Sequence, residues 1–319
     1  MGITEQTIVE QFPFWRAALG PRQPLPAAPV TVFVGCGTSY NLALALAASA
    51  NAGGRPALAV PGREWVDRPH SYWPDWQSAH VVALSRSGET TETIDAARAS
   101  RAAGASVTGI TCAAGSGLAA ACDRIVFAET HPAEGIVMTA SASLMLLMGL
   151  QLIGVPIDAA VVDAAEAALA ATDAVAADLV AGRSHFVYLG GGPLYGIAVE
   201  GALKLLEMSQ TFAQAFHPLE YRHGPISLLD ERTVGVMLYG DARPDDEALL
   251  VAEMQEKGAR VIGFGGPGDI SVPLPVSGAL AGLAALPALQ LIGERVAEAN
   301  GRDTLQPRHL TKVVMLTSA

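Results

Sequence analysis

An internal repeat constrains the fold of this 319-residue chain more than any other feature. The segment VFVGCGTSYNLALA begins at Val32, and VYLGGGPLYGIAVE begins at Val187, an offset of 155 residues. A second pair, GASVTGIT from Gly104 and GARVIGFG from Gly258, repeats at an offset of 154. Two matched pairs at nearly the same spacing indicate that one αβ unit has been duplicated. The identical positions of the first pair are Val32/Val187, Gly35/Gly190, Gly37/Gly192, Tyr40/Tyr195 and Ala43/Ala198.

Short apolar runs alternate with helical segments in each copy. The expected strands are Thr31–Val34, Val81–Leu84 and Ser106–Thr111 in the first copy and Phe186–Leu189, Val234–Leu238 and Arg260–Phe264 in the second. The expected helices are Thr90–Ala103 and Asp245–Lys257. Continuous apolar strands that alternate with helices are typical of parallel sheets covered on both faces. We therefore expect an α/β fold with two αβα domains, and a ligand site beyond the carboxyl ends of the strands.

The expected domain organisation follows the repeat. An Ala-rich segment without Gly or Pro, residues 158–181, is predicted to be a helix that joins the two halves. The expected parts are an N-terminal helical arm (1–29), a first αβα domain (30–157), a linker helix (158–182), a second αβα domain (183–300) and a C-terminal tail (301–319).

Charge and cysteine content exclude several classes of protein. The 20 basic and 31 acidic residues give a net charge of −11, which argues against a nucleic-acid-binding surface. Three cysteines cannot form a disulfide framework, and no export signal is visible at the N-terminus. The stretch taken as most apolar, residues 144–156, is too short to span a bilayer. We expect a soluble cytoplasmic protein with no nucleic-acid or membrane partner.

The first glycine-rich loop, Gly35–Ser39, follows a strand and opens a helix. Glycine lets the backbone approach a ligand, and hydroxyls with free helix amides can bind an anion. Alternatively, the glycines serve only the geometry of a strand-to-helix turn. The loop lacks the third glycine of a dinucleotide fingerprint. The candidate binding residues here are Cys36, Gly37, Thr38 and Ser39, with Cys36 interpreted as a small buried residue and not as a nucleophile.

A second polar loop, Ser85–Thr90, lies at the end of the second expected strand. Its three hydroxyls, one guanidinium and several helix-start amides suit a phosphate group. The alternative is an ordinary helix N-cap with acidic residues in the first turn. The candidate binding residues in this loop are Ser85, Arg86, Ser87 and Thr90.

Two further segments carry titratable groups. Glu200, Lys204 and Glu207 share one face of an expected helix with apolar surroundings. They are either a solvent-exposed ion pair or proton-transfer groups with shifted pKa values. His217, Glu220 and His223 have a spacing that suggests a metal site, but Pro218 and a Gly-Pro turn disfavour a regular ligand face, so we expect no metal. His223 is better placed as a general acid/base.

Lys312 is the candidate of the C-terminal tail. It precedes the strand-like run VVML, next to an apolar stretch, and a desolvated lysine amine can attack a carbonyl. Alternatively, the tail is only a surface edge without a role in chemistry.

Five motifs together resemble the SIS (sugar isomerase) domain family, in particular the isomerase half of glutamine–fructose-6-phosphate aminotransferase. The resemblance runs from about residue 30 to the C-terminus. The motifs, in their order along the chain, are CGTS at 36–39, SRSGET at 85–90, EGALKLLE at 200–207, EYRHGP at 220–225 and QPRHLTK at 306–312.

The resemblance implies roles for individual residues. The hydroxyl loops would hold a sugar phosphate, with Arg86 at a position where the family usually has Gln. Glu207 would move a proton between C1 and C2, assisted by Lys204, and Lys312 would form a Schiff base. His223 would open the sugar ring, and in the family this histidine reaches in from the neighbouring subunit, which implies a homodimer. The family segment VASTKAF corresponds to residues 137–143, so Val137 and Thr139 would contact the ligand, with Thr139 replacing a serine.

The expected reaction is the isomerising deamination of glucosamine 6-phosphate to fructose 6-phosphate and ammonia. It needs no metal or organic cofactor, because the imine is the electron sink. We expect no use of glutamine, because residue 2 is Gly and only about 30 residues precede the first strand. The alternatives are a deglycase of phosphorylated fructosamines, an aldose–ketose phosphosugar isomerase, and a sugar-phosphate-binding regulator without catalysis.

Overall fold

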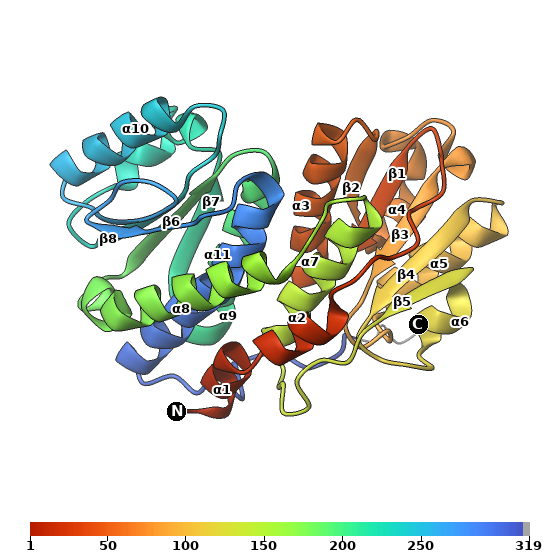
Figure 1. Ribbon diagram of the computed structural model, residues 1–319, viewed down its shortest axis with the longest axis horizontal. Helices are drawn as coiled ribbons and strands as arrows, with labels where there is room; N and C mark the ends of the chain where they lie inside the picture. The colour runs from red at the N-terminus through yellow and green to blue at the C-terminus, as the bar shows by residue number, and fades with distance from the viewer. Residues whose placement is uncertain (315–319) are drawn as a thin grey trace. The chain divides into compact units, whose positions relative to one another are not determined.

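The computed structural model describes residues 1–314, which divide into two compact units (Figure 1). The N-terminal unit comprises Pro13–Ile157 together with the tail from Thr311. The C-terminal unit comprises Met1–Phe12 and Asp158–Leu310. The first and last segments of the chain therefore each belong to the unit formed mainly by the other half of the sequence.

The N-terminal unit contains a five-stranded parallel sheet in the order β2-β1-β3-β4-β5. Its central pair is in register, with Val32 of β1 beside Val81 of β3. The elements are α2 (Phe12–Ala18), β1 (Thr31–Gly35), α3 (Thr38–Ala52), β2 (Ala57–Pro61), α4 (Gly62–Asp67), η1 (Pro69–Ser71), η2 (Trp76–Ser78), β3 (His80–Leu84), α5 (Thr91–Ala102), β4 (Ser106–Thr111), α6 (Gly117–Ala121), β5 (Arg124–Phe127) and α7 (Ala140–Leu152).

The C-terminal unit repeats this topology with a sheet in the order β10-β9-β8-β6-β7, again all parallel. Read from the other edge, β7-β6-β8-β9-β10 matches the first sheet strand for strand, which confirms the duplication and the α/β fold. The elements are α1 (Ile3–Val9), α8 (Ala159–Val180), β6 (His185–Gly190), α9 (Pro193–Ser209), β7 (Phe212–Phe216), η3 (Leu219–Arg222), η4 (Pro225–Leu228), β8 (Thr233–Leu238), α10 (Pro244–Glu256), β9 (Arg260–Phe264), β10 (Ile270–Val272) and α11 (Gly278–Ala299).

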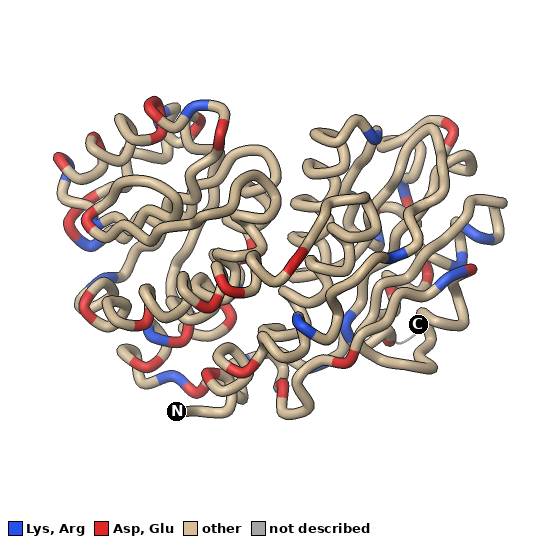
Figure 2. Tube along the Cα trace, in the orientation of Figure 1, with Lys and Arg blue, Asp and Glu red and all other residues tan. Residues whose placement is uncertain are grey.

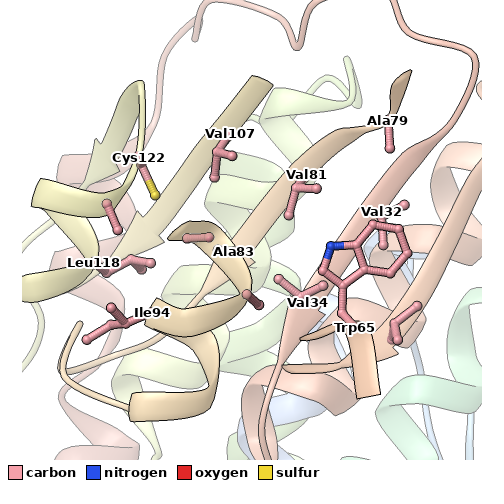
Figure 3. Packing of buried hydrophobic residues seen from close by; sticks show 14 of the residues in the cluster. Val32, Val34, Trp65, Ala79, Val81, Ala83, Ile94, Val107, Leu118 and Cys122 are labelled. Carbon is pink, nitrogen blue, oxygen red and sulfur yellow. The ribbon is translucent and has the colours of Figure 1, made fainter. Parts of the chain in front are cut away.

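Each unit is stabilised by apolar packing on its central strands. In the N-terminal unit the indole of Trp65 packs beside Val32 and Val34, while Leu118 and Cys122 lie farther along the same layer (Figure 3). Every residue of β1 and β3 is buried, as continuous apolar strands under helices require. Figure 2 shows that most of the trace is uncharged and that charged positions concentrate on helices and loops around the sheets.

One expectation about an apolar segment is wrong where the structure describes it, and one long apolar helix was not considered. Residues 313–316 were expected to form a strand, but Val313 and Val314 lie outside any strand, and the remaining two residues lie outside the described part of the chain. The more important membrane-length candidate is α11, whose 22 residues are long and apolar enough to cross a bilayer by length and composition. This helix packs against α8 and α9, and 83% of its apolar window is buried within the protein.

Candidate functional site

The first loop of the candidate site joins β1 to α3. Gly37 adopts φ 55° and ψ −126° as the N-cap of α3, a conformation that residues with a side chain rarely adopt. Thr38 and Ser39 follow at the start of the helix and are each 4% exposed. Cys36 is half-buried, and burial is the main cause that raises the pKa of its thiol. A protonated thiol is a weak nucleophile, which agrees with the interpretation of Cys36 as a small packing residue.

The second loop, residues 85–90, folds back on itself between β3 and α5. Ser85 Oγ accepts a hydrogen bond from the Gly88 amide at 3.1 Å and donates to Thr90 Oγ1 at 3.3 Å. Ser87 Oγ accepts from the Glu89 amide at 3.1 Å. Gly88 has φ 66°, and a Cβ there would lie 2.0 Å from Ser116 Oγ, so only glycine fits. The hydroxyls therefore shape the turn themselves and gather at the N-terminus of α5, where an anion is favoured.

The side chain of Arg86 makes its contacts within the unit. It was predicted to bind the substrate, but it is only 8% exposed and its guanidinium is engaged within the protein. Nη1 donates to Gly135 O at 3.1 Å, and Nη2 donates to Ile136 O and Lys312 O at 3.0 and 3.1 Å. The guanidinium also pairs with the Glu134 carboxylate at 3.5 Å. These contacts make Arg86 a link between three segments of the unit.

Glu134 is a central residue of the site that the sequence analysis missed. Its Oε1 accepts hydrogen bonds from the Thr139 amide at 2.7 Å, Thr139 Oγ1 at 3.1 Å and the Ser141 amide at 2.9 Å. A carboxylate at this position satisfies the free amides at the start of α7. Thr139, expected to contact the ligand, is fully buried with its hydroxyl on Glu134, and Val137 is 4% exposed. The sequence did contain a signal for Glu134: an acidic residue shortly before an apolar helix, in a chain with few charges.

Lys312 joins this cluster from the C-terminal tail. Its Nζ donates to the backbone oxygen of Glu134 at 2.8 Å, and its own backbone oxygen accepts from Arg86. The residue is exposed, while the hydrogen bond that its amine donates is partly buried. A cavity of about 610 Å³ lies beside the cluster. It is lined by Phe14, Arg86, Ser87, Cys112, Ala113, Glu129, Thr130, His131, Pro132, Glu134 and Lys312.

Helix α9 of the C-terminal unit carries a buried charged triad. Glu200 and Lys204 are both fully buried, with Lys204 Nζ 3.4 Å from Glu200 Oε1, and Nζ also donates to Glu207 Oε2. Glu207 is 20% exposed, so of the two carboxylates it is the one that reaches the surface. Burial lowers the pKa of Lys204, but the two carboxylates outweigh it and the net pKa lies above the ordinary value. The alternative of a solvent-exposed ion pair is therefore wrong, and Lys204 remains an ammonium.

His223 lies at the end of η3 in the same unit and is exposed. Its amide donates to Glu220 O at 3.0 Å. His217 instead stacks on Tyr195, with ring centroids 4.1 Å apart. Within residues 1–314, no group of three or more His, Cys, Asp or Glu side chains is arranged to hold a metal ion.

The candidate residues thus form two sets, each within one unit. The N-terminal unit carries the hydroxyl loops, Arg86, Glu134 and Lys312, whereas the C-terminal unit carries Lys204, Glu207 and His223. Together with the matching sheets, these features define a duplicated α/β protein with a polar loop cluster at the strand ends of one copy. A family model of the SIS domain matches residues 28–154 and 179–269, so the chain belongs to the SIS domain family.

Comparisons with individual proteins agree with this assignment. The chain is 29% identical, over 91% of its length, to glutamine–fructose-6-phosphate aminotransferase (isomerizing) of Pyrobaculum aerophilum, and spans about half (52%) of that relative. It is 28% identical to glucosamine-6-phosphate deaminase of Thermotoga maritima, whose crystal structure superimposes with a TM-score of 0.83 over 99% of this chain and 100% of that one. Tagatose-6-phosphate ketose/aldose isomerase of Escherichia coli shares the fold, with a TM-score of 0.79 at 24% identity over 93% of this chain and 92% of that one.

Proposed function

We propose that the protein is a phosphosugar isomerase that deaminates glucosamine 6-phosphate, giving fructose 6-phosphate and ammonia. The observation that carries this proposal is the match to the Thermotoga maritima glucosamine-6-phosphate deaminase, which extends over 99% of this chain and all of that one.

The hydroxyl loops of the N-terminal unit are the proposed phosphate site. Ser85, Ser87 and Thr90 carry neutral hydroxyls at the start of α5, where helix amides favour a dianion. Ser39 adds a hydroxyl at the start of α3, a second helix N-terminus of the same unit. Hydroxyls can turn from their present partners to a phosphate, because their hydrogens rotate freely.

Glu207 is the proposed proton carrier. In the open-chain sugar it removes the proton from C2. The electron pair of that C–H bond forms the C1=C2 bond of an enolamine, while the C1 carbonyl oxygen takes up a proton from water. The same carboxyl then returns the proton to C1, which leaves an imine at C2. Water adds to this imine carbon, the C–N bond breaks, and ammonia leaves as fructose 6-phosphate forms. One carboxylate close to both carbons suffices for this 1,2-shift.

Lys204 and His223 complete the proposed chemistry. The Lys204 ammonium donates to Glu207 and is itself held by Glu200, so it orients the Glu207 carboxylate. Exposed His223 opens the sugar ring as a general acid/base and, in this proposal, does so in the site of a second copy in a homodimer. Lys312 orients the open-chain sugar and is not an obligatory covalent catalyst, since the substrate already carries its own nitrogen.

The test is to incubate the purified protein with glucosamine 6-phosphate and to measure ammonia and fructose 6-phosphate independently. Equimolar release of both is expected, with Glu207→Gln as the matched inactive control. Interconversion of an aldose and a ketose phosphate without ammonia would instead identify an aldose–ketose isomerase. Turnover of a phosphorylated fructosamine alone would identify a deglycase. Binding of all these sugars without turnover would identify a regulator, and each of these three results would overturn the proposal.

A further inference from the structure

Arg86 lies between Ser85 and Ser87 in the sequence of the proposed phosphate loop and is buried. Its side chain, however, hydrogen-bonds to other segments of the chain. A buried guanidinium is costly unless it is paired and hydrogen-bonded. Here both terminal nitrogens are used: Nη1 contacts Gly135 O and the Glu134 carboxylate, and Nη2 contacts Ile136 O and Lys312 O. The backbone oxygen of Arg86 accepts from the Cys112 amide at 3.1 Å, so the residue is also anchored to the end of β4.

Glu134 holds the other side of the same arrangement. Its side chain is 3% exposed, and Oε1 accepts three hydrogen bonds at the start of α7, so the carboxylate is fixed in position. Its backbone oxygen accepts from Lys312 Nζ at 2.8 Å. Lys312 is therefore held at two points, its main chain by Arg86 and its amine by the Glu134 backbone. The described tail residues 311–314 form no helix or strand that would hold them otherwise.

We propose that Arg86 and Glu134 are positioning residues for Lys312, which couple the phosphate-binding loop to the C-terminal tail. The role of Lys312 toward the sugar rests on the proposed function, whereas the hold on the tail does not. Since Ser85, Arg86 and Ser87 are consecutive, movement of this loop on phosphate binding is transmitted to Lys312 through the guanidinium. The arrangement places an otherwise exposed amine at a fixed position relative to the loop.

The first experiment measures the tail directly and needs no substrate. Trypsin cleaves after Arg308 and Lys312, which are both exposed, and mass spectrometry follows release of the C-terminal peptides. Arg86→Gln removes the charge-assisted donors to the tail, so these cleavages should accelerate about tenfold or more. Arg98→Gln is the matched control, because Arg98 is an exposed arginine on α5 of the same unit, and its cleavage rates should equal those of the unchanged protein.

Equal tail cleavage in Arg86→Gln and the unchanged protein, with both folded by circular dichroism, would overturn the hold. If Arg86→Gln does not fold, Arg86→Lys keeps the charge opposite Glu134 but has fewer donors for the carbonyls. Its cleavage rate should then lie above that of the unchanged protein, and an unchanged rate would count against the proposal in the same way.

The second experiment uses turnover of glucosamine 6-phosphate and separates positioning from a general loss of structure. If Arg86 acts through the amine of Lys312, Arg86→Gln should lower kcat while KM changes less than about threefold. In a Lys312→Ala background the same substitution should lower kcat no further. An equal loss of kcat in both backgrounds would show that Arg86 does not act through Lys312. Absence of deaminase activity in the unchanged protein would refute the proposed function, while the trypsin experiment would still decide the hold.

Discussion

Substitutions in the Glu200–Lys204–Glu207 triad should separate a stabilising role from a chemical one. Glu200 and Lys204 are both 0% exposed, so removing the amine in Lys204→Met leaves the Glu200 carboxylate buried without a cation. Loss of one partner of a buried ion pair costs about 3–5 kcal/mol. In Glu207→Gln, by contrast, Lys204 keeps Glu200 at 3.4 Å and a neutral amide oxygen can still accept from Nζ. We expect that substitution to cost only about 0.5–1.5 kcal/mol of unfolding free energy.

Turnover should show the reverse order. Glu207→Gln replaces the proposed proton carrier with a group that cannot accept a proton, so kcat should fall by about 10²–10⁴-fold with little change in sugar-phosphate binding. That fall corresponds to about 3–5 kcal/mol in the activation barrier, larger than the expected change in stability. Glu200→Gln is the matched control, because it removes a carboxylate from the same lysine without touching the one that reaches the surface.

Urea unfolding followed by circular dichroism gives the stability order, and steady-state ammonia release gives the turnover order. We expect Lys204→Met to lose the most stability and Glu207→Gln to lose the most turnover among folded variants. A loss of stability in Glu207→Gln as large as that in Lys204→Met would make Glu207 a structural residue. If a fully folded Glu200→Gln variant were as inactive as Glu207→Gln, the assignment of proton transfer to Glu207 would be wrong.

Three further predictions concern the other residues of the site and the core. Ser87→Ala combined with Thr90→Ala should weaken sugar-phosphate binding by about 1–3 kcal/mol without unfolding the protein. An unchanged KM would show that this loop is not the phosphate site. Burial, reinforced by nearby arginines, lowers the pKa of His80 from 6.5 to about 4, so the unfolded chain binds a proton there that the native one does not. The free energy of unfolding should therefore fall by up to about 3 kcal/mol as pH drops from about 6.5 to 4. Urea unfolding at several pH values should show that this free energy depends less on pH in His80→Gln than in the unchanged protein. Mixing inactive Glu207→Gln with inactive His223→Asn should restore part of the activity if His223 serves a second subunit, and no recovery after verified subunit exchange would refute that sharing.

The central part of each sheet could be predicted from the sequence, and the edges could not. Strands β3 and β8 are buried along their whole length, so they read as continuous apolar runs. The expected strands Ser106–Thr111 and Arg260–Phe264 match the observed bounds of β4 and β9. The outer strands are partly exposed and were missed. Even the fully apolar one, β2 (ALAVP), contains two alanines, which do not favour a strand. These missed strands are β2, β5, β7 and β10.

The polar loops of the candidate site were visible in the sequence, but the partners of their charges were not. Spacing alone placed Glu200, Lys204 and Glu207 on one face of α9, yet it could not say whether that face was buried. The partner of Arg86 lies 48 residues away in a loop, and only the folded chain brings Glu134 to it. A buried charge needs a partner, but the sequence alone does not show that Arg86 is buried, because burial is a property of the tertiary structure.

The two copies share a backbone but differ in the side chains that it carries. Gly37 and Gly192 have the same angles, φ 55° and ψ −126°, at the start of α3 and α9. After this glycine the first copy has Thr38 and Ser39, whereas the second has a proline and a leucine, which bring no hydroxyl. At the next strand end, the Gly240 amide of the second copy donates to a buried carboxylate, Glu247 Oε2, at 2.9 Å.

Under the proposed function, that carboxylate makes the second copy less suited to a phosphate. Glu247 is 7% exposed, and burial, the largest cause, raises its pKa, but an acid beside the loop amides competes with an incoming dianion in either protonation state. The first copy binds its loop amides with serine hydroxyls, which can be exchanged for phosphate oxygens. Conversely, the α9 positions of Glu200, Lys204 and Glu207 correspond at the offset of 155 to Ala45, Ser49 and Ala52 of α3, where no titratable group is present. Under the proposed reaction, duplication has thus left hydroxyls suited to anion binding on one copy and titratable groups suited to proton transfer on the other.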